Sequence, residues 1–421
     1  MCVIYSYRVQ QPTFSRFDRG VNMATGPSVA VVGGGISGLV CAVRLTQLGI
    51  QNVTVFDTGK HAAGGRCSSR HVNIDGRLHT FDHSTQYFTV SDKRFCNVVS
   101  FLHSQGAVKV WQGRLGHLKD GNFFPMKSLT QAFVGVDGMS SISSCLSSRV
   151  NLKRPVWIGK VSWEDVSRKW KVDRCGYFDY LVIAHNGKCA DRLMSDAGVP
   201  KVHRLLQVRF TPRLDIKDKR MQLSSLWMLM AAFPKSLCLS YEGAHVEDPD
   251  ISWVANNTAK LSQNKMSVNG IECWTVFSTK EFGSAHKVPQ ENIPPRKEKQ
   301  VTDELLTAFA RVTGLGSKLP PPRYTKVQLW GAAVPLNTLY TKEECVFDGQ
   351  HNVGICGDWL VSPCIQGAAV SGLRLAEFIQ NHSSGTDRTG TNLQPEFTAV
   401  DGPVIGSFPT DSSIIFKPKA T

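Results

Sequence analysis

The sequence has no hydrophobic run long enough to cross a membrane. Its most apolar stretch, residues 226–233, is far shorter than the roughly 20 residues that a membrane-spanning helix needs. The N-terminal segment also has no apolar core of the kind found in secretory signal peptides. We therefore expect no transmembrane segment and no secretion.

Recognisable metal and redox motifs are missing as well. The twelve cysteines contain no CxxC pair and no Cys/His cluster with zinc spacing. Several of them, such as Cys41 and Cys356, lie in apolar stretches, where a free thiol packs as a small hydrophobe. We expect no metal site, and a reducing, cytoplasmic compartment rather than an extracellular one.

Clustered positive charge is absent, although the chain is basic overall. Lys plus Arg total 48 against 34 for Asp plus Glu, which gives a formal net charge of +14. These residues are scattered and form no basic patch with interleaved aromatics, so we expect no nucleic-acid partner. At 421 residues, 42% of them hydrophobic, the chain fits two or three domains or one two-lobed enzyme.

Residues 1–26 precede the first expected strand and form a flexible extension. Arg8, Arg16 and Arg19 stand against a single acid, a pattern typical of transit peptides for a plastid or mitochondrion. Met23 is equally suited to start a form without a leader. The sequence leaves an organelle open beside the cytoplasm.

The segment 29–57 predicts a dinucleotide-binding unit. An apolar strand at 29–32 runs into a glycine-rich turn and a helix, and a second strand at 53–56 ends in Asp57. Such a turn lets the backbone approach a pyrophosphate, and the acid can hydrogen-bond a ribose hydroxyl. The candidate ligands here are Gly33, Gly35, Ser37, Gly38 and Asp57.

A second glycine signal follows at residues 62–70. Gly64 and Gly65 suit another close approach of the backbone to a bound cofactor, and Arg66 is available to an anionic group. An ordinary turn is the alternative. Further on, the strand at 180–184 ends in a turn at 185–187 that is expected to line a site.

The C-terminal part contains a third signal. A strand at 353–355 leads to Gly357 and Asp358, and a Gly/Ala-rich helix begins a few residues later. The positive end of such a helix can be directed at negative charge on a flavin ring. Together with the N-terminal turn, this pattern favours FAD over a nicotinamide.

With a D-x-x-x-Q-Y-F segment at 82–88, these motifs resemble the flavin amine oxidase superfamily, and within it the renalase-like FAD/NAD(P)-binding oxidoreductases. The resemblance covers about residues 27–380 and implies FAD as cofactor. It implies that Asp358 contacts the ribityl or pyrophosphate portion, and that Gln366 and Gly367 lie beside the flavin pyrimidine. It also implies a backbone contact from Val156 to adenine, although the local sequence indicates a plain strand residue.

The resemblance implies a small-molecule substrate that lies against the flavin between two lobes. The candidate catalytic residues are Gln86, Tyr87 and Trp330, and core packing is the alternative for each. The implied reaction takes a hydride from an amine or a reduced nitrogen heterocycle, including dihydronicotinamide isomers, and passes the electrons to oxygen. Two alternatives stay open: a flavin oxidase or desaturase for polyene or porphyrin-type substrates, and a non-catalytic escort protein.

We expect an α/β fold: a Rossmann-type FAD-binding domain with an inserted antiparallel-sheet substrate domain (α+β). The cofactor domain is assigned to 27–90, 135–190 and 324–380, the substrate domain to 91–134 and 191–323, and a disordered tail to 381–421. The pattern predicts helices at 94–103, 140–146 and 301–312, the last capped by Thr302. It predicts strands at 150–158 and 205–210 and a surface loop at 280–299.

Overall fold

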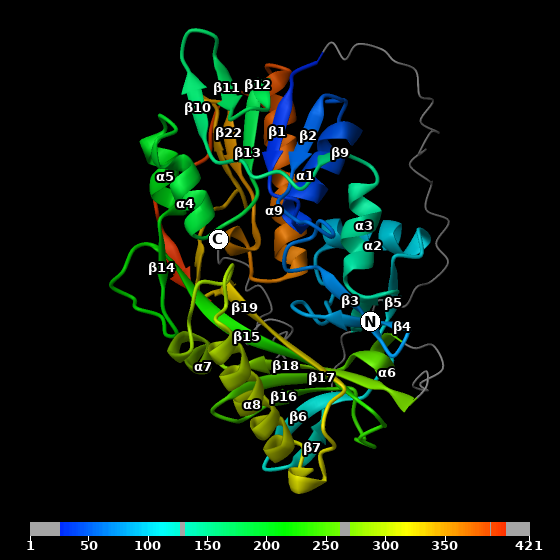
Figure 1. The fold of residues 1–421 in the computed structure, drawn as a ribbon. Helices are drawn as coiled ribbons and strands as arrows, with labels where there is room; N and C mark the ends of the chain where they lie inside the picture. Colours follow the sequence, from blue (N-terminus) through cyan, green and yellow to red (C-terminus); the bar gives the residue numbers. More distant parts are fainter. Residues whose placement is uncertain (1–25, 127–130, 262–269, 388, 401–421) are drawn as a thin grey trace, which may run out of the picture.

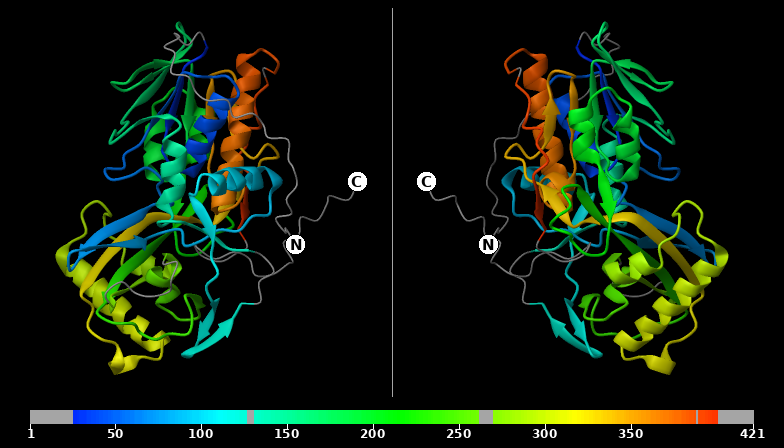
Figure 2. Two further views of the ribbon diagram at one scale, coloured as in Figure 1. Left: turned by 90° about the vertical axis from the view of Figure 1, so that its right-hand side faces the viewer. Right: turned by 90° about the vertical axis from the view of Figure 1, so that its left-hand side faces the viewer.

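The computed structural model describes residues 26–126, 131–261, 270–387 and 389–400. These residues form two lobes, one built on a six-stranded sheet and the other on an eight-stranded sheet (Figure 1). The side views in Figure 2 show the two lobes stacked one above the other. None of the helices described in these ranges is both long and apolar enough to span a membrane.

The six-stranded sheet collects strands from distant parts of the chain. Its order is β21-β22-β13-β1-β2-β9, and all neighbours are parallel except β21 and β22. The inner strands β1, β2, β13 and β22 are short and apolar because a parallel sheet is buried on both faces, whereas the edge strand β9 is mostly exposed. The six strands are β1 (Val29–Val32), β2 (Val53–Phe56), β9 (Asn151–Lys153), β13 (Tyr180–Ile183), β21 (Val346–Asp348) and β22 (Val353–Ile355).

Alternate side chains of this sheet enter two separate cores. Val31 and Val182 pack with one helical layer, whereas Leu181 and Ile183 pack with the opposite layer. The first layer contains α1 (Ile36–Gln47), α2 (Lys93–Ser104), α3 (Ser140–Ser147) and α9 (Ile365–Ser383). The second contains α4 (Lys188–Ser195), α5 (Pro200–Leu206), β10 (Val161–Glu164), β11 (Lys169–Val172) and β12 (Gly176–Phe178).

Helices α1 and α9 lie side by side, although they come from opposite ends of the described chain (Figure 1). Gly372 of α9 permits this contact, since a Cβ there would overlap the carbonyl oxygen of Ser37 in α1. The late helix is thereby fixed beside the start of the first one.

The eight-stranded sheet forms the second lobe and is mixed. Its path is β14-β15-β18-β17-β16-β6-β7, with β19 paired to β15. Most neighbours are antiparallel, while β14–β15 and β16–β6 are parallel. The strands are β6 (Leu115–Lys119), β7 (Asn122–Pro125), β14 (Val208–Phe210), β15 (Met221–Phe233), β16 (Gly243–Val246), β17 (Ile251–Asn256), β18 (Glu272–Ser278) and β19 (Tyr324–Pro335).

Helices α7 (Lys280–Ala285) and α8 (Pro295–Val312) pack on this second sheet, with α8 running along one face (Figure 1). Smaller elements complete the description: β3 (Ser69–Ile74), β4 (Arg77–Asp82), β5 (Val108–Val110), β8 (Phe133–Gly135), α6 (Asn257–Leu261), η2 (Gly316–Lys318), β20 (Asn337–Leu339), η3 (Asp358–Leu360) and β23 (Phe397–Ala399). The predicted fold class, a Rossmann-type domain with an inserted and mainly antiparallel sheet, is confirmed.

Three predictions between residues 205 and 302 were wrong. Residues 205–206 end α5, so only 208–210 form a strand. The predicted loop at 280–299 contains α7 and the first turn of α8, because proline is compatible with a helix start. Thr302 is no cap: it lies inside α8, where its hydroxyl donates to the carbonyl of Glu298 at 2.8 Å.

The predicted strand at 150–158 ends at Lys153, which leaves Val156 in a loop. Residues 324–335, expected in the cofactor domain, form β19, which pairs with β15 in the second sheet.

Residues 381–400, which the sequence assigned to the tail, contain regular structure. Helix α9 continues to Ser383, and β23 pairs with β20. The ring of Phe397 stacks on Trp359 with centroids 6.3 Å apart. Residues 401–421, like 1–25 of the predicted extension, lie outside the described chain.

Candidate functional site

A cavity of about 620 Å³ lies at the carboxyl ends of β1, β2 and β13 and reaches β19 of the second lobe. Its volume falls within the roughly 300–1,000 Å³ of small-molecule sites. The wall includes predicted residues from every motif: Gly33, Gly35, Ser37, Asp57, Gly64, Gly65, Arg66, Tyr87, Val156, Trp330, Gly357 and Asp358. The predicted turn at 185–187 also lines it.

The two N-terminal glycine signals meet at this cavity. The backbone N–H of Gly64 donates to the carbonyl of Gly34 at 2.8 Å, and Gly35 pairs with Gly64 in an isolated bridge. A Cβ on Gly35 would meet no atom within 4 Å, and one on Gly65 would meet only the Gly35 Cα at 4.0 Å. The backbone at both positions therefore borders open space.

Gly33 and Gly38 serve the packing around the turn. Gly33 has a φ of +117°, and a Cβ there would lie 2.9 Å from the carbonyl oxygen of Ala184. Gly38 is not part of the cavity wall, and a Cβ on it would overlap the Gly33 carbonyl. The third predicted glycine thus allows α1 to lie close to β1 and does not line the cavity.

The N-terminus of α1 opens toward the cavity. Gly35 occupies the N-cap position without a side-chain hydrogen bond, and the first turn contains no acidic residue. Gly35, Ile36 and Ser37 all line the wall. Uncapped N–H groups with partial positive charge are suited to bind an anion such as a pyrophosphate.

Asp57 lies at the end of β2 with its carboxylate held by the backbone. The N–H of Gly34 donates to Oδ2 at 2.9 Å, and the N–H of Gly59 donates to Oδ1 at 2.8 Å. Each carboxylate oxygen can accept further hydrogen bonds, so a ribose hydroxyl remains a suitable partner. The N–H of Val156 donates to the Asp57 carbonyl at 2.8 Å, which brings the predicted adenine contact beside the predicted ribose ligand.

Arg66 and Asp358 bind each other on the cavity wall. Two parallel hydrogen bonds of 2.8 and 2.7 Å join the guanidinium to the carboxylate, and Arg66 also donates to the carbonyl of Ala333 at 3.1 Å. The sequence assigned each of them directly to a cofactor. The structure instead gives each a protein partner, so neither is left as an isolated charge.

Gln366 and Gly367 do not reach the cavity. The Gln366 amide oxygen accepts the N–H groups of Ser91 and Asp92 at 2.8 and 2.9 Å. A Cβ on Gly367 would lie 2.8 Å from the hydroxyl of Ser362, so this glycine serves close packing. The residues at the start of α9 that line the cavity are Cys364, Ile365 and Ala368.

The three candidate catalytic residues separate into two groups. Gln86 is completely buried and is not part of the cavity wall, because its amide donates to the carbonyls of Asp82 and Ser84 at 2.6 and 2.9 Å. Tyr87 and Trp330 line the cavity. The structure therefore retains these two as candidates and places Gln86 in the core.

Trp330 is held in place by His83. Its indole N–H donates to the His83 carbonyl at 2.8 Å, and the two rings stack with centroids 5.6 Å apart. Burial, followed by the positive charge of Arg70, lowers the pKa of His83 to about 4. His83 is therefore neutral near pH 7.

A buried ion pair lies beneath this wall. Lys260 and Asp82 are both fully buried, and their Nζ and Oδ2 atoms are 2.7 Å apart. Lys260 also donates to the backbone and side-chain oxygens of Gln86 at 3.3 and 3.4 Å. No sequence motif marks Lys260, because a single lysine after a strand is usually an exposed residue.

Two wall residues carry buried polar atoms without a partner among the described residues. These atoms are Nδ2 of Asn186 and Nε1 of Trp359. Unpaired buried donors are costly, so their presence on a cavity wall indicates a ligand with acceptor groups.

Comparison with known proteins agrees with this architecture. Residues 31–102 match the family model described as an NAD(P)-binding Rossmann-like domain. Reduced UDP-galactopyranose mutase is 11% identical with a TM-score of 0.59, covering 86% of this chain and 95% of that one. Cyclohexylamine oxidase from Brevibacterium oxydans IH-35A is 12% identical with a TM-score of 0.56, covering 85% and 99%. Wild-type putrescine oxidase bound to putrescine is 12% identical with a TM-score of 0.53, covering 84% and 98%.

At 11–12% identity, the similarity to these solved structures establishes the fold and not the reaction. The fold is a Rossmann-like α/β domain joined to a second lobe with a mixed sheet, and this chain shares it with the two amine oxidases compared. An oxidase of amines and a mutase of a sugar nucleotide both share it, so the reaction has to be argued from the site.

Proposed function

We propose that this chain is an FAD-dependent oxidoreductase that takes a hydride from a small amine or a reduced nitrogen heterocycle and passes the electrons to oxygen. The observation that carries the proposal is the meeting of both glycine turns, Asp57 and the Arg66–Asp358 pair around one cavity. The open space beside Gly35 and Gly65 provides room for a ligand against the backbone.

The residues that line the cavity are suited to hold FAD. The uncapped start of α1 would hold the pyrophosphate, Asp57 the ribose, and the loop at Val156 the adenine. The unpaired N–H groups of Asn186 and Trp359 would donate to acceptor atoms of the cofactor. When bound, the flavin supplies the hydride acceptor itself, so the protein needs few reactive side chains.

The chain's own residues would orient the substrate and exclude water. Tyr87 and Trp330 offer aromatic surface to a flat substrate. The Trp330 ring is fixed by its bond to the His83 carbonyl, and Tyr87 packs between Trp111 and Trp253. Neutral His83 adds no positive charge next to a cationic amine or a departing hydride.

Two similarities support a small amine or a reduced nitrogen heterocycle as the substrate. Amine oxidases are among the proteins with this fold. The sequence resemblance to renalase-like oxidoreductases favours a reduced nitrogen heterocycle, with dihydronicotinamide isomers as the first candidates to test. Oxygen as acceptor follows from the same resemblance.

An absorbance spectrum of the purified protein, followed by denaturation and identification of the released chromophore, tests the cofactor. We expect flavin bands and free FAD. Anaerobic mixing with cyclohexylamine and with dihydronicotinamide isomers should then bleach the flavin, and air should restore its colour. Protein that retains no FAD after reconstitution would refute the proposal and favour an escort protein.

A further inference from the structure

At one end of the cavity lie Lys188, Lys287 and Phe210, and we call these three residues the basic end. All three residues line the cavity, and both lysines are exposed to solvent. The Lys287 ammonium lies 3.7 Å from the centroid of the Phe210 ring, and the Lys188 ammonium lies 5.8 Å from it. Two positive charges therefore converge on one aromatic side chain.

We propose that the basic end binds an anionic group of the substrate, a carboxylate or a phosphate. This inference rests on the proposed function and specifies its substrate class. The two lysines would favour a reduced heterocycle or an amine that bears a negative group. A simple aliphatic diamine would be disfavoured, because its second cation would be repelled at this end.

The charges at the basic end are not balanced by ion pairs. Within the residues that the structure describes, neither lysine forms an ion pair with a carboxylate. Of the other charged wall residues, Arg66 is bonded to Asp358, and Asp57 accepts backbone N–H groups. Glu291 is the remaining acid on the wall. The wall therefore carries three cations and three carboxylates, and its formal charge is zero. Lys188 and Lys287 are available to an anionic group because neither is held in an ion pair by a described residue, unlike Arg66.

The pKa of Lys287 agrees with this arrangement. Partial loss of hydration at the exposed Lys287 ammonium lowers its pKa first, and the positive charge of Lys188 lowers it further. Two like charges held close together cost free energy, and a bound anion between them would remove that cost.

The basic end lies next to Trp330, the aromatic residue proposed to contact the substrate. Lys287 lies 3.5 Å from the carbonyl of Gly331, whose N–H donates to Gln290 at 3.0 Å. Gly187, which precedes Lys188, would place a Cβ 3.2 Å from the Cβ of Ala332. Lys287 itself and the residue before Lys188 thus lie beside the two residues that follow Trp330 in β19.

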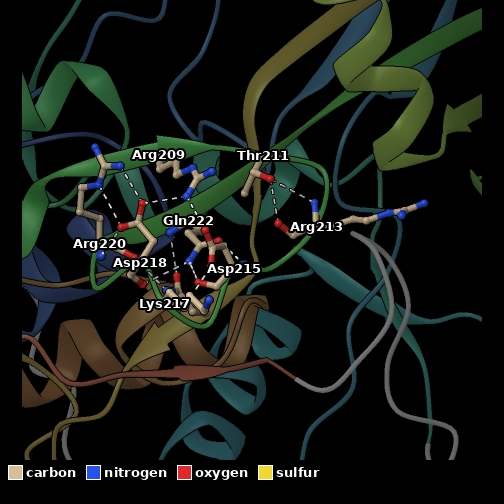
Figure 3. A network of polar contacts seen from close by, with 9 residues as sticks. Arg209, Thr211, Arg213, Asp215, Lys217, Asp218, Arg220 and Gln222 are labelled. Atoms are coloured by element: carbon tan, nitrogen blue, oxygen red, sulfur yellow. Dashed lines mark hydrogen bonds and ion pairs between the residues drawn. The ribbon is translucent and has the colours of Figure 1, made fainter.

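The connection between β14 and β15, which begins directly after Phe210, contains a separate polar network (Figure 3). Arg209 donates to Asp215 and Asp218 at 2.7 and 3.1 Å, and Arg220 donates to Asp218 at 2.7 Å. The Gln222 amide bonds both backbone groups of Asp215. Arg209 and Arg220 are paired with these carboxylates, whereas Lys188 and Lys287 are the cations whose ammonium groups lie over the Phe210 ring.

Isothermal titration calorimetry of the FAD-loaded protein tests the inference with three probes of similar shape: benzoate, phenyl phosphate and benzamide. We expect at least one anion to bind about tenfold tighter than neutral benzamide, and the two anions distinguish carboxylate from phosphate. The double variant Lys188→Ala/Lys287→Ala should lose that preference, whereas Lys318→Ala, a lysine outside the cavity, should retain it.

Equal binding of benzamide and both anions would overturn the inference, as would an unchanged anion affinity in the double variant. Loss of FAD from the double variant would also overturn it, since the lysines would then hold the cofactor. If the wild-type protein shows no flavin absorbance, the proposed function fails, and the same titrations on the protein as purified still decide whether the basic end binds anions.

Discussion

The guanidinium of Arg66 and the carboxylate of Asp358 form two parallel hydrogen bonds of 2.8 and 2.7 Å across 292 positions of sequence. Arg66 follows the second glycine turn, and Asp358 follows the last strand of the six-stranded sheet. The pair therefore joins the first and last parts of the cavity wall.

Asp358→Asn should weaken this junction. An amide offers one acceptor instead of two and carries no charge, so we expect a loss of about 1–3 kcal/mol in the free energy of unfolding, together with weaker FAD retention. Urea unfolding measures the first effect. Lys119→Ala, which breaks the exposed pair with Glu247, is the control and should cost at most about 1 kcal/mol. Equal midpoints for Asp358→Asn and wild type would contradict the prediction.

Gly35 and Gly33 should respond differently to substitution. Gly35 has a φ of −75° and faces open space, so Gly35→Val should fold normally and lower FAD affinity by filling the cavity. Gly33→Ala should lower stability by about 1–3 kcal/mol, because of its positive φ and the nearby Ala184 carbonyl. Thermal unfolding and the ratio of flavin to protein separate the two effects. A Gly35→Val protein with full flavin content would show that the cofactor does not approach this turn.

His83 should make stability depend on pH. Unfolded histidine takes up a proton near pH 6.5, whereas folded His83 does so only near pH 4. The unfolded state therefore binds more protons between these values, and stability should fall as the pH is lowered from 6.5 to 4, by about 3 kcal/mol from this residue. His83→Gln should flatten that part of the curve. Parallel curves for variant and wild type, from urea unfolding at several pH values, would exclude this contribution.

The buried pair of Lys260 and Asp82 should show strong coupling. Lys260→Met leaves a buried carboxylate without its cation, and we expect a loss of about 3–5 kcal/mol. Adding Asp82→Asn removes the unpaired charge, so the double variant should be more stable than the sum of the two single effects predicts. Urea unfolding of all four proteins gives the coupling energy. Simple additivity would mean that the two charges do not stabilise each other.

The ends of the fold could be predicted because their signals are local. The apolar run at 29–32 and the glycines that follow it constrain one another within a few residues, and the strand at 353–355 repeats that pattern. The helices α4 and α5 were not predicted as such, since each is short. Their stability comes from tertiary packing against the sheet rather than from local pattern.

The sequence predicted which segments lie near the cavity, but it did not predict which side chains of those segments point into it. Gln86 and Tyr87 are neighbours in one motif, yet one enters the core and the other the cavity. Gln366 was placed on the correct helix start, but its side chain points to Ser91. The bond between Arg66 and Asp358 depends on how the whole chain folds, so no sequence spacing could show it.

The order of strands in the six-stranded sheet has a consequence for synthesis. β13 ends at Ile183, but its neighbour β22 begins about 170 residues later, at Val353. At 5–20 residues per second, the ribosome needs roughly 10–30 s to make the intervening chain. During that interval β13 has an unpaired edge, α1 lacks α9, and Arg66 lacks its carboxylate. The cavity wall is therefore complete only after the chain has been made through Asp358 and α9, and until then the exposed edge of β13 can pair with other strands.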